Sequence, residues 1–233
     1  MTRGSATLRR SLILIIVMVA LGPATLRAAS GGGGGKNEFH GASYAEWTQR
    51  WWQWYMSLPV GVNQGNDPTG VHLAIGQHPP VWFIAGPLGS SYTRSITIPS
   101  GTTILNPLFN YLNDYPCPGP PFEPAPGQSL EDFLQAGAAP IIDACTVHDA
   151  DIDGSPLDVQ RVSAGLFAFT AAADIVTLDP CATGSPQLGI SDGWWSVLDP
   201  LSVGQHVLHV HTEVPAFGLV TDGTFNITVT PKK

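Results

Sequence analysis

The alternation of hydrophobic and polar positions first indicates a helix near the start of the chain. Between residues 44 and 57, aromatic residues recur at intervals of three and four, which is typical of one helix face. Ser43 and Glu46 have the spacing of a capping box, so we expect the helix to begin after Ser43 and to end before Pro59. The face contains Tyr44, Trp47, Trp51, Trp54 and Tyr55. This regular spacing favours a core position for the face over a sugar-stacking platform.

Strand patterns dominate from residue 80 onward. The segment 224–230 alternates cleanly, so we expect its three large apolar side chains to point the same way. These side chains are Phe225, Ile227 and Val229. Asp-Gly pairs favour tight hairpin turns, and they punctuate the alternating segments at 153–154, 192–193 and 222–223. The pattern therefore predicts short strands joined by turns.

A second helix is expected to begin after Ser129, where another capping pattern starts, and to break near Gly137 and Pro140. The segment 113–128 holds six prolines, which predicts a loop. About nine strands and two helices indicate a mainly β fold. We predict a single antiparallel β-sandwich of jelly-roll-like type, with the Trp-rich helix at its N-terminus and one inserted helix.

The first 37 residues have the pattern of an export segment. Basic residues precede an apolar run at 12–21, and small residues at Ala28 and Ala29 offer a cleavage point. The run is shorter than the ~20 residues that a membrane span needs. We therefore predict a signal peptide at 1–29, a Gly-rich spacer at 30–37 and one domain at 38–233. An uncleaved anchor is the alternative, because Arg27 stands close to the expected cut.

Composition narrows the classes of function. Hydrophobic residues make up 43% of the chain, enough to bury a core, so global disorder is excluded. The net charge is −8, and removal of residues 1–29, which hold four Arg and no acid, would change it to −12. A chain this acidic lacks the clustered Lys and Arg that bind phosphates, so we expect no nucleic-acid partner. We expect a secreted or periplasmic protein, without a stable membrane anchor once the signal peptide is cleaved.

Three cysteines in an exported chain leave one unpaired. Cys117 and Cys181 both lie in Pro-containing loop sequences, and we expect them to form a disulfide in an oxidising compartment. Cys145 follows an apolar stretch and has the pattern of a small buried hydrophobic residue. Three pairings are open from the sequence.

Four segments, in this order along the chain, resemble a known group of proteins. They are the Trp-rich helix at 44–54, the two strand segments 80–86 and 98–108, and the closing block 191–206. Together they resemble a family of uncharacterised secreted bacterial proteins with a Trp-rich N-terminal helix followed by a β-rich domain. The resemblance covers nearly all of the chain after the export segment. It implies an exported, one-domain protein and brings no assigned activity.

A His-x-His pair is the best chemical candidate in the sequence. On a strand, His209 and His211 would share one face with Cα atoms roughly 6.5–7 Å apart, so both imidazoles could converge on one Zn or Cu ion. A third ligand would have to come from Glu213, His148, His72 or His78. The simpler interpretation, which we prefer at this stage, is that both histidines are solvent-facing residues of an ordinary strand.

Two further motifs have weaker support. Asp149, Asp151 and Asp153 precede Gly154 as in a calcium loop, but Gln160 stands where that loop needs a bidentate Glu, so we prefer a hairpin. The segment 189–193 matches Gly-x-Ser-x-Gly. Its surroundings do not have the strand–turn–helix pattern that exposes a nucleophilic serine.

These observations favour an exported binding or structural module without catalysis, whose partner is an extracellular glycan or another envelope component. The first alternative is a metal-dependent exported enzyme with His209 and His211 at its site. The second is a glycan hydrolase whose carboxylates the spacing does not place. Exposed, coplanar Trp52 and Trp82 would favour sugar stacking, and burial of all seven tryptophans would argue against it.

Overall fold

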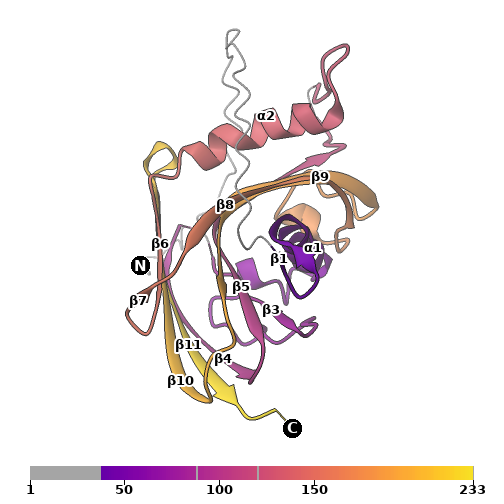
Figure 1. Ribbon diagram of the computed structural model, residues 1–233. Helices are drawn as coiled ribbons and strands as arrows, with labels where there is room; N and C mark the ends of the chain where they lie inside the picture. The colour runs from indigo at the N-terminus through magenta and orange to yellow at the C-terminus, as the bar shows by residue number, and fades with distance from the viewer. Residues whose placement is uncertain (1–37, 88, 120, 233) are drawn as a thin grey trace, which may run out of the picture. The chain divides into compact units, whose positions relative to one another are not determined.

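A computed structural model describes residues 38–87, 89–119 and 121–232 (Figure 1). The predicted signal peptide at 1–29 and the spacer at 30–37 lie outside these residues. The described chain contains no helix that is long and apolar enough to cross a membrane.

The first helix forms where the sequence predicts it. After a short hairpin of β1 (Glu38–Phe39) and β2 (Ala42–Ser43), α1 spans Tyr44–Ser57. The capping box is confirmed, because the Glu46 amide donates to Ser43 Oγ at 3.2 Å and the Ser43 amide donates to Glu46 Oε2 at 2.8 Å. These bonds satisfy amides that the first helical turn leaves free.

The remaining elements form two main sheets, which we call the inner and outer sheets. The inner sheet has the order β3 (Val81–Phe83), β5 (Thr103–Tyr115), β9 (Pro186–Leu198) and β8 (Val159–Thr170). The outer sheet has the order β4 (Ser91–Pro99), β11 (Leu219–Thr230), β10 (Gly204–Val214), β6 (Val147–Ile152) and β7 (Ser155–Pro156). Short 3₁₀ helices span Gln64–Asn66, Ile175–Thr177 and Pro215–Phe217.

The fold is mainly β and sandwich-like, as predicted, with the Trp-rich helix at its N-terminal end. Most neighbouring strands are antiparallel. Two pairs at the sheet edges, β3 with β5 and β4 with β11, are parallel, a mixture that the sequence did not predict. Parallel partners need long connections, and short-range turn signals do not reveal them.

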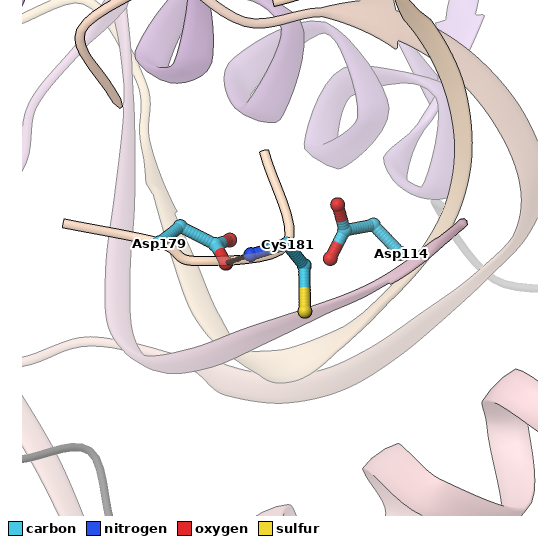
Figure 2. Close-up of side chains that lie close together, drawn as sticks. All are labelled: Asp114, Asp179 and Cys181. Carbon is cyan, nitrogen blue, oxygen red and sulfur yellow. Dashed lines mark hydrogen bonds between the residues drawn. The ribbon is translucent and has the colours of Figure 1, made fainter. Parts of the chain in front are cut away.

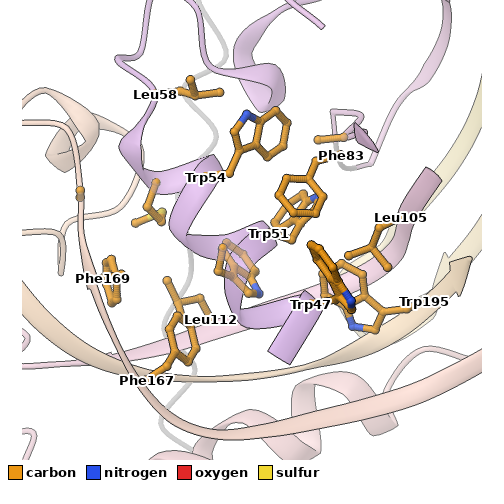
Figure 3. Packing of buried hydrophobic residues seen from close by; sticks show 14 of the residues in the cluster. Trp47, Trp51, Trp54, Leu58, Phe83, Leu105, Leu112, Phe167, Phe169 and Trp195 are labelled. Carbon is orange, nitrogen blue, oxygen red and sulfur yellow. The ribbon is translucent and has the colours of Figure 1, made fainter. Parts of the chain in front are cut away.

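Helix α1 covers one face of the inner sheet, and its aromatic side chains fill the space between them. Figure 3 shows Trp47, Trp51 and Trp54 projecting from α1 among Phe83, Leu105 and other residues of one buried cluster. The indole N–H groups of these three tryptophans donate to backbone carbonyls at 2.7–3.0 Å. The aromatic face is therefore core, as its spacing predicted, and each of the three indoles has a polar partner.

The opposite face of the inner sheet is shared between the outer sheet and α2 (Leu130–Asp143), which lies across β5 and β9 (Figure 1). The two sheets bury aliphatic side chains between them. These include Ile104, Leu108 and Leu198 from the inner sheet and Ile98, Leu208, Val210, Phe225 and Ile227 from the outer sheet. Removing this apolar surface from water is the main stabilising contribution to such a core.

Helix α2 begins after Ser129, as predicted, but the expected break near Gly137 and Pro140 is wrong. The helix continues through Pro140 to Asp143. A proline inside a helix removes one backbone hydrogen bond. Here three fully buried side chains, Leu134, Ala138 and Ile142, anchor the helix, and their burial offsets that loss. The segment 113–128 is likewise only partly loop, because β5 extends to Tyr115.

Only one of the three Asp-Gly pairs forms the predicted turn. Asp153 and Gly154 have positive φ angles of 52° and 76° and join β6 to β7. The pairs at 192–193 and 222–223 lie inside β9 and β11, so those two predictions are wrong.

The two misread glycines are needed for close packing instead of chain reversal. A Cβ on Gly193 would lie 2.6 Å from the Cβ of Asn110, and a Cβ on Gly223 would lie 2.3 Å from the ring of Tyr92. Asp192 is fully buried and accepts hydrogen bonds from Arg161 at 2.8 and 3.1 Å. Arg161 also contacts Asp143 at the end of α2 and so ties this helix to the inner sheet.

Cys117 and Cys181 form a disulfide, as the sequence predicted. It joins the segment after β5 to the loop before β9, 64 residues further along the chain. Cys145 is free and buried, also as predicted, and burial raises the pKa of its thiol.

Candidate functional site

The solvent face of the outer sheet carries both candidate histidines. Along β10, Leu208 and Val210 are buried against the inner sheet, whereas His209 and His211 point the other way and are 39% and 28% exposed. This is the placement that strand alternation predicted.

Strand register brings carboxylates to these histidines from both neighbouring strands. On the β6 side, His209 lies opposite Asp151 and His211 lies opposite Asp149. On the β11 side, His211 lies opposite Asp222. Residues that are opposite each other in a sheet point to the same face, so three carboxylates surround the imidazole pair.

Asp222 lies between the two imidazoles. Its Oδ1 is 3.0 Å from His209 Nε2, and its Oδ2 is 3.7 Å from His211 Nδ1. The other ring nitrogens face further carboxylates. His209 Nδ1 is 3.4 Å from Asp151 Oδ2, and His211 Nε2 is 3.2 Å from Glu213 Oε1. We call these five side chains the imidazole–carboxylate site.

A cavity of about 530 Å³ borders this site. It is lined by His148, Asp149, Ala150, Asp151, Pro156, Leu157, Val159, His209 and His211. The lining combines charged groups of the solvent face with apolar side chains near the β6–β7 hairpin. The site therefore adjoins a partly open depression on the solvent face of the outer sheet.

The four third ligands considered from the sequence are not placed between the imidazoles. Glu213 contacts the far nitrogen of His211. His148 stacks on Trp194 with ring centroids 3.7 Å apart, and its burial lowers its pKa. His72 and His78 lie in the segment between the first 3₁₀ helix and β3. Asp222 takes the position instead, and its Asp-Gly context had pointed to a turn.

His206, the third histidine of the same segment, has a separate role. Its Nδ1 lies 2.6 Å from Asp153 Oδ2, and this hydrogen bond raises the pKa of the imidazole. Asp153 Oδ1 also accepts a hydrogen bond from the Val207 amide at 2.8 Å. Asp151 Oδ1 accepts from the Gly154 amide at 3.1 Å. The acidic segment is therefore a hairpin, as preferred over a calcium loop, in which Asp151 caps the turn and Asp153 bonds to β10.

The ligand atoms of His209, His211 and Asp222 do not yet have the spacing of a closed metal centre. Among the described residues, one set of three side chains brings its ligand atoms within 4.8 Å of one another: Asp114, Asp179 and Cys181 (Figure 2). The Cys181 sulfur belongs to the disulfide, so it offers no thiolate to a metal.

Asp114 and Asp179 form an acid pair in which Asp114 is buried and Asp179 is half-buried. Asp114 is only 3% exposed, and burial together with the neighbouring Asp179 raises its pKa to about 7. Burial also raises the pKa of Asp179, whose Oδ1 accepts a hydrogen bond from the Cys181 amide at 2.9 Å. Gln187 Nε2 lies within 3.1 Å of three acceptors, Asp114 Oδ2 and the carbonyls of Pro116 and Cys181.

This acid pair does not have the setting that glycan hydrolysis requires. Glycosidase carboxylates flank a sugar in an open cleft. Asp114 is instead covered by Gln187 and the disulfide-linked loop, and neither acid lines the 530 Å³ cavity. The pair therefore belongs to the packing of this loop.

The serine motif and the tryptophans are also structural. Ser191 is fully buried within β9, and its Oγ accepts a hydrogen bond from Trp52 Nε1 at 3.0 Å. Six of the seven tryptophans are buried, Trp52 and Trp82 among them, and Trp194 is half-buried under His148. Trp52 and Trp82, whose exposure would have favoured sugar stacking, are therefore buried, whereas burial of all seven tryptophans is not met, because Trp194 is half-buried.

Comparisons with known proteins identify no relative of this chain. No family model, no curated protein and no solved structure matches the chain. The imidazole–carboxylate site is therefore the main guide to function.

Proposed function

We propose that the chain is an exported binding module without catalytic activity, and that it binds a divalent transition-metal ion through His209, His211 and Asp222. One observation carries the proposal: the carboxylate of Asp222 on β11 lies between the two imidazoles of the adjacent strand β10, at 3.0 and 3.7 Å from their facing nitrogens. Closing these three side chains around one ion would give two nitrogen ligands and one oxygen ligand.

The donor set favours zinc or copper. Imidazole nitrogen and carboxylate oxygen are common ligands of Zn²⁺ and Cu²⁺, whereas Ca²⁺ and Mg²⁺ prefer sites built from oxygen alone. Three protein ligands leave a coordination position for water or for a group of a partner molecule.

Export to a secreted or periplasmic location is the second part of the proposal. It is supported by the basic and apolar start of the chain and by the resemblance to secreted bacterial proteins with a Trp-rich helix. The Cys117–Cys181 disulfide adds support, because disulfides persist in oxidising compartments. An envelope component remains the proposed partner.

A metal-dependent exported enzyme is the second candidate, favoured by the cavity of about 530 Å³ beside the site. Hydrolase and oxidase assays of the zinc- and copper-loaded protein test it. Turnover that disappears in a His209→Ala/His211→Ala variant would replace the non-catalytic interpretation.

The metal proposal is tested with the full chain, produced with its own N-terminal segment and without a His tag. The protein is loaded with Zn²⁺ or Cu²⁺, dialysed, and analysed for bound metal. We expect about one equivalent, lost in the His209→Ala/His211→Ala variant, because removing both imidazoles removes two of three ligands. A matched His72→Ala/His78→Ala variant controls for loss of histidine elsewhere. Absence of bound metal, or equal binding by both double variants, contradicts the proposal.

A further inference from the structure

The two outer carboxylates of the site have a role that the ligand set alone does not reveal. We infer that Asp151 and Glu213 are positioning residues that hold the far ring nitrogens, so that His209 presents Nε2 and His211 presents Nδ1 to the metal. This inference rests on the proposed function, because it describes how the same site is prepared for its ion.

The argument begins with the chemistry of histidine. A neutral imidazole carries one proton, and the hydrogen bond at one nitrogen decides which nitrogen is free to bind a metal. Metal-binding histidines therefore usually donate their second ring N–H to a carboxylate, a carbonyl or water. Such a partner fixes both the tautomer and the orientation of the ring.

Both imidazoles of this site have a carboxylate at the far nitrogen. Asp151 Oδ2 lies 3.4 Å from His209 Nδ1, and Glu213 Oε1 lies 3.2 Å from His211 Nε2. Asp222 faces the remaining nitrogen of each ring. The far nitrogen of His211 is thus within hydrogen-bonding distance of Glu213, the far nitrogen of His209 is within ion-pair distance of Asp151, and Asp222 faces the near nitrogen of each ring.

The backbone determines this arrangement. Asp151 is placed opposite His209 by the antiparallel register of β6 and β10, and Glu213 follows His211 by two residues on the same face of β10. The two rings therefore turn different nitrogens toward Asp222. His209 presents its ε nitrogen and His211 its δ nitrogen toward Asp222, which lies between them.

Asp149 provides a matched control beside the imidazole–carboxylate site. It lies on the same face of β6, opposite His211, and it lines the same cavity. None of the ion pairs found among the described side chains joins it to either imidazole. Removing Asp149 therefore changes the local charge by the same amount as removing Asp151 and leaves both far nitrogens held.

The experiment measures Zn²⁺ affinity of the full chain by competition with a chelator, together with the stoichiometry. Glu213→Ala and Asp151→Ala are expected to bind about 10- to 100-fold more weakly, as is typical for loss of such carboxylates, and still at one equivalent. Asp149→Ala is expected to stay within about threefold of the unmodified protein, since the far nitrogens keep their partners. The electron paramagnetic resonance spectrum of bound Cu²⁺ should change in the first two variants and not in the third.

Asp151→Asn separates positioning from folding effects. Asp151 Oδ1 also accepts a hydrogen bond from the Gly154 amide, so the alanine variant weakens the turn as well. Asparagine keeps an acceptor oxygen, so it should restore much of the affinity that alanine loses. The thermal midpoint of each metal-free variant shows whether the fold is retained.

The possible failures are distinguishable. If Glu213→Ala and Asp151→Ala both bind Zn²⁺ like the unmodified protein while His209→Ala/His211→Ala does not bind, the positioning role is wrong and the metal site stands. If Asp149→Ala weakens binding as much as the other two, the effect is one of charge, and the inference is also overturned. If the double histidine variant binds normally, the proposed function itself fails.

Discussion

Asp222 and Asp114 are both strand residues whose carboxylates meet other polar groups, but their surroundings are opposite. Asp222 lies on the solvent face of β11, with an imidazole near each oxygen. Asp114 is buried near the end of β5, where it faces Asp179 and the amide of Gln187. None of the ion pairs among the described residues includes Asp114 or Asp179.

The comparison shows that the burial of a carboxylate and the charge of its partners determine whether it is held in the packed interior or left accessible on the surface. A buried carboxylate without a cationic partner is stabilised in its protonated form, which is why the pKa of Asp114 rises to about 7. An exposed carboxylate beside imidazoles can rotate and exchange its partners at little cost. Asp114 therefore serves the packing of its loop, whereas Asp222 is the carboxylate that we propose as a metal ligand.

Removing the disulfide beside Asp114 should have the largest effect on the free energy of unfolding. A Cys117→Ser/Cys181→Ser variant removes a cross-link between residues 64 positions apart, which corresponds to about 4 kcal/mol in the free energy of unfolding. Water would then reach Asp114 and lower its pKa toward the usual range. Chemical unfolding, with and without reductant, measures the first effect, and ¹³C-detected titration of the carboxyl measures the second. A variant of unchanged stability would show that the loop is held without the disulfide.

Replacing the buried acid should have a pH-dependent effect that is smaller except above pH 7. The folded pKa of Asp114 lies above the unfolded value, so the folded state binds the proton more tightly and stability falls as the pH rises from about 4 to about 7. Asp114→Asn keeps the shape and removes this loss. Above pH 7 it should be more stable than the unmodified protein by about 4 kcal/mol, with little difference at pH 4.

Unfolding free energies of both proteins across this pH range provide the measurement. Asp199→Asn, at an exposed position between β9 and β10, is the control and should show no such divergence. Parallel pH profiles for Asp114→Asn and the unmodified protein would mean that Asp114 has no unusual environment.

Replacing the exposed acid should have the smallest effect on stability. Asp222→Asn removes a charge whose partners are all partly exposed, so the free energy of unfolding should change by less than about 1 kcal/mol. Metal binding should nevertheless be strongly weakened, because a ligand is lost. Thermal unfolding without metal gives the first quantity and chelator competition the second. A large loss of stability would show that Asp222 supports the sheet, and the contrast with Asp114 would disappear.

Local patterns were sufficient for several features of the molecule. The capping box of Ser43 and Glu46, the aromatic face of α1 and the alternation around His209 and His211 depend on neighbours within one helical turn or one strand. The mainly β class follows from the same short-range periodicity. Each of these predictions is confirmed because the tertiary packing favours the same local structure that the sequence pattern favours.

Other features depended on contacts between distant segments. Gly193 and Gly223 resemble turn residues until Asn110 and Tyr92 are seen packed against their Cα atoms. Asp222 becomes a candidate ligand only through the register of β10 with β11, and no spacing along the chain encodes which residue of one strand lies opposite which residue of another.

The proximity of Asp114 and Asp179 also could not be predicted from the sequence pattern. Asp114 and Asp179 are brought together by the disulfide-linked loop, far apart in the chain. Periodicity along the chain was enough to predict which way a side chain points, because it depends on backbone geometry alone. Tertiary structure decided which groups meet, because burial, register and cross-linking act between segments that the sequence leaves independent.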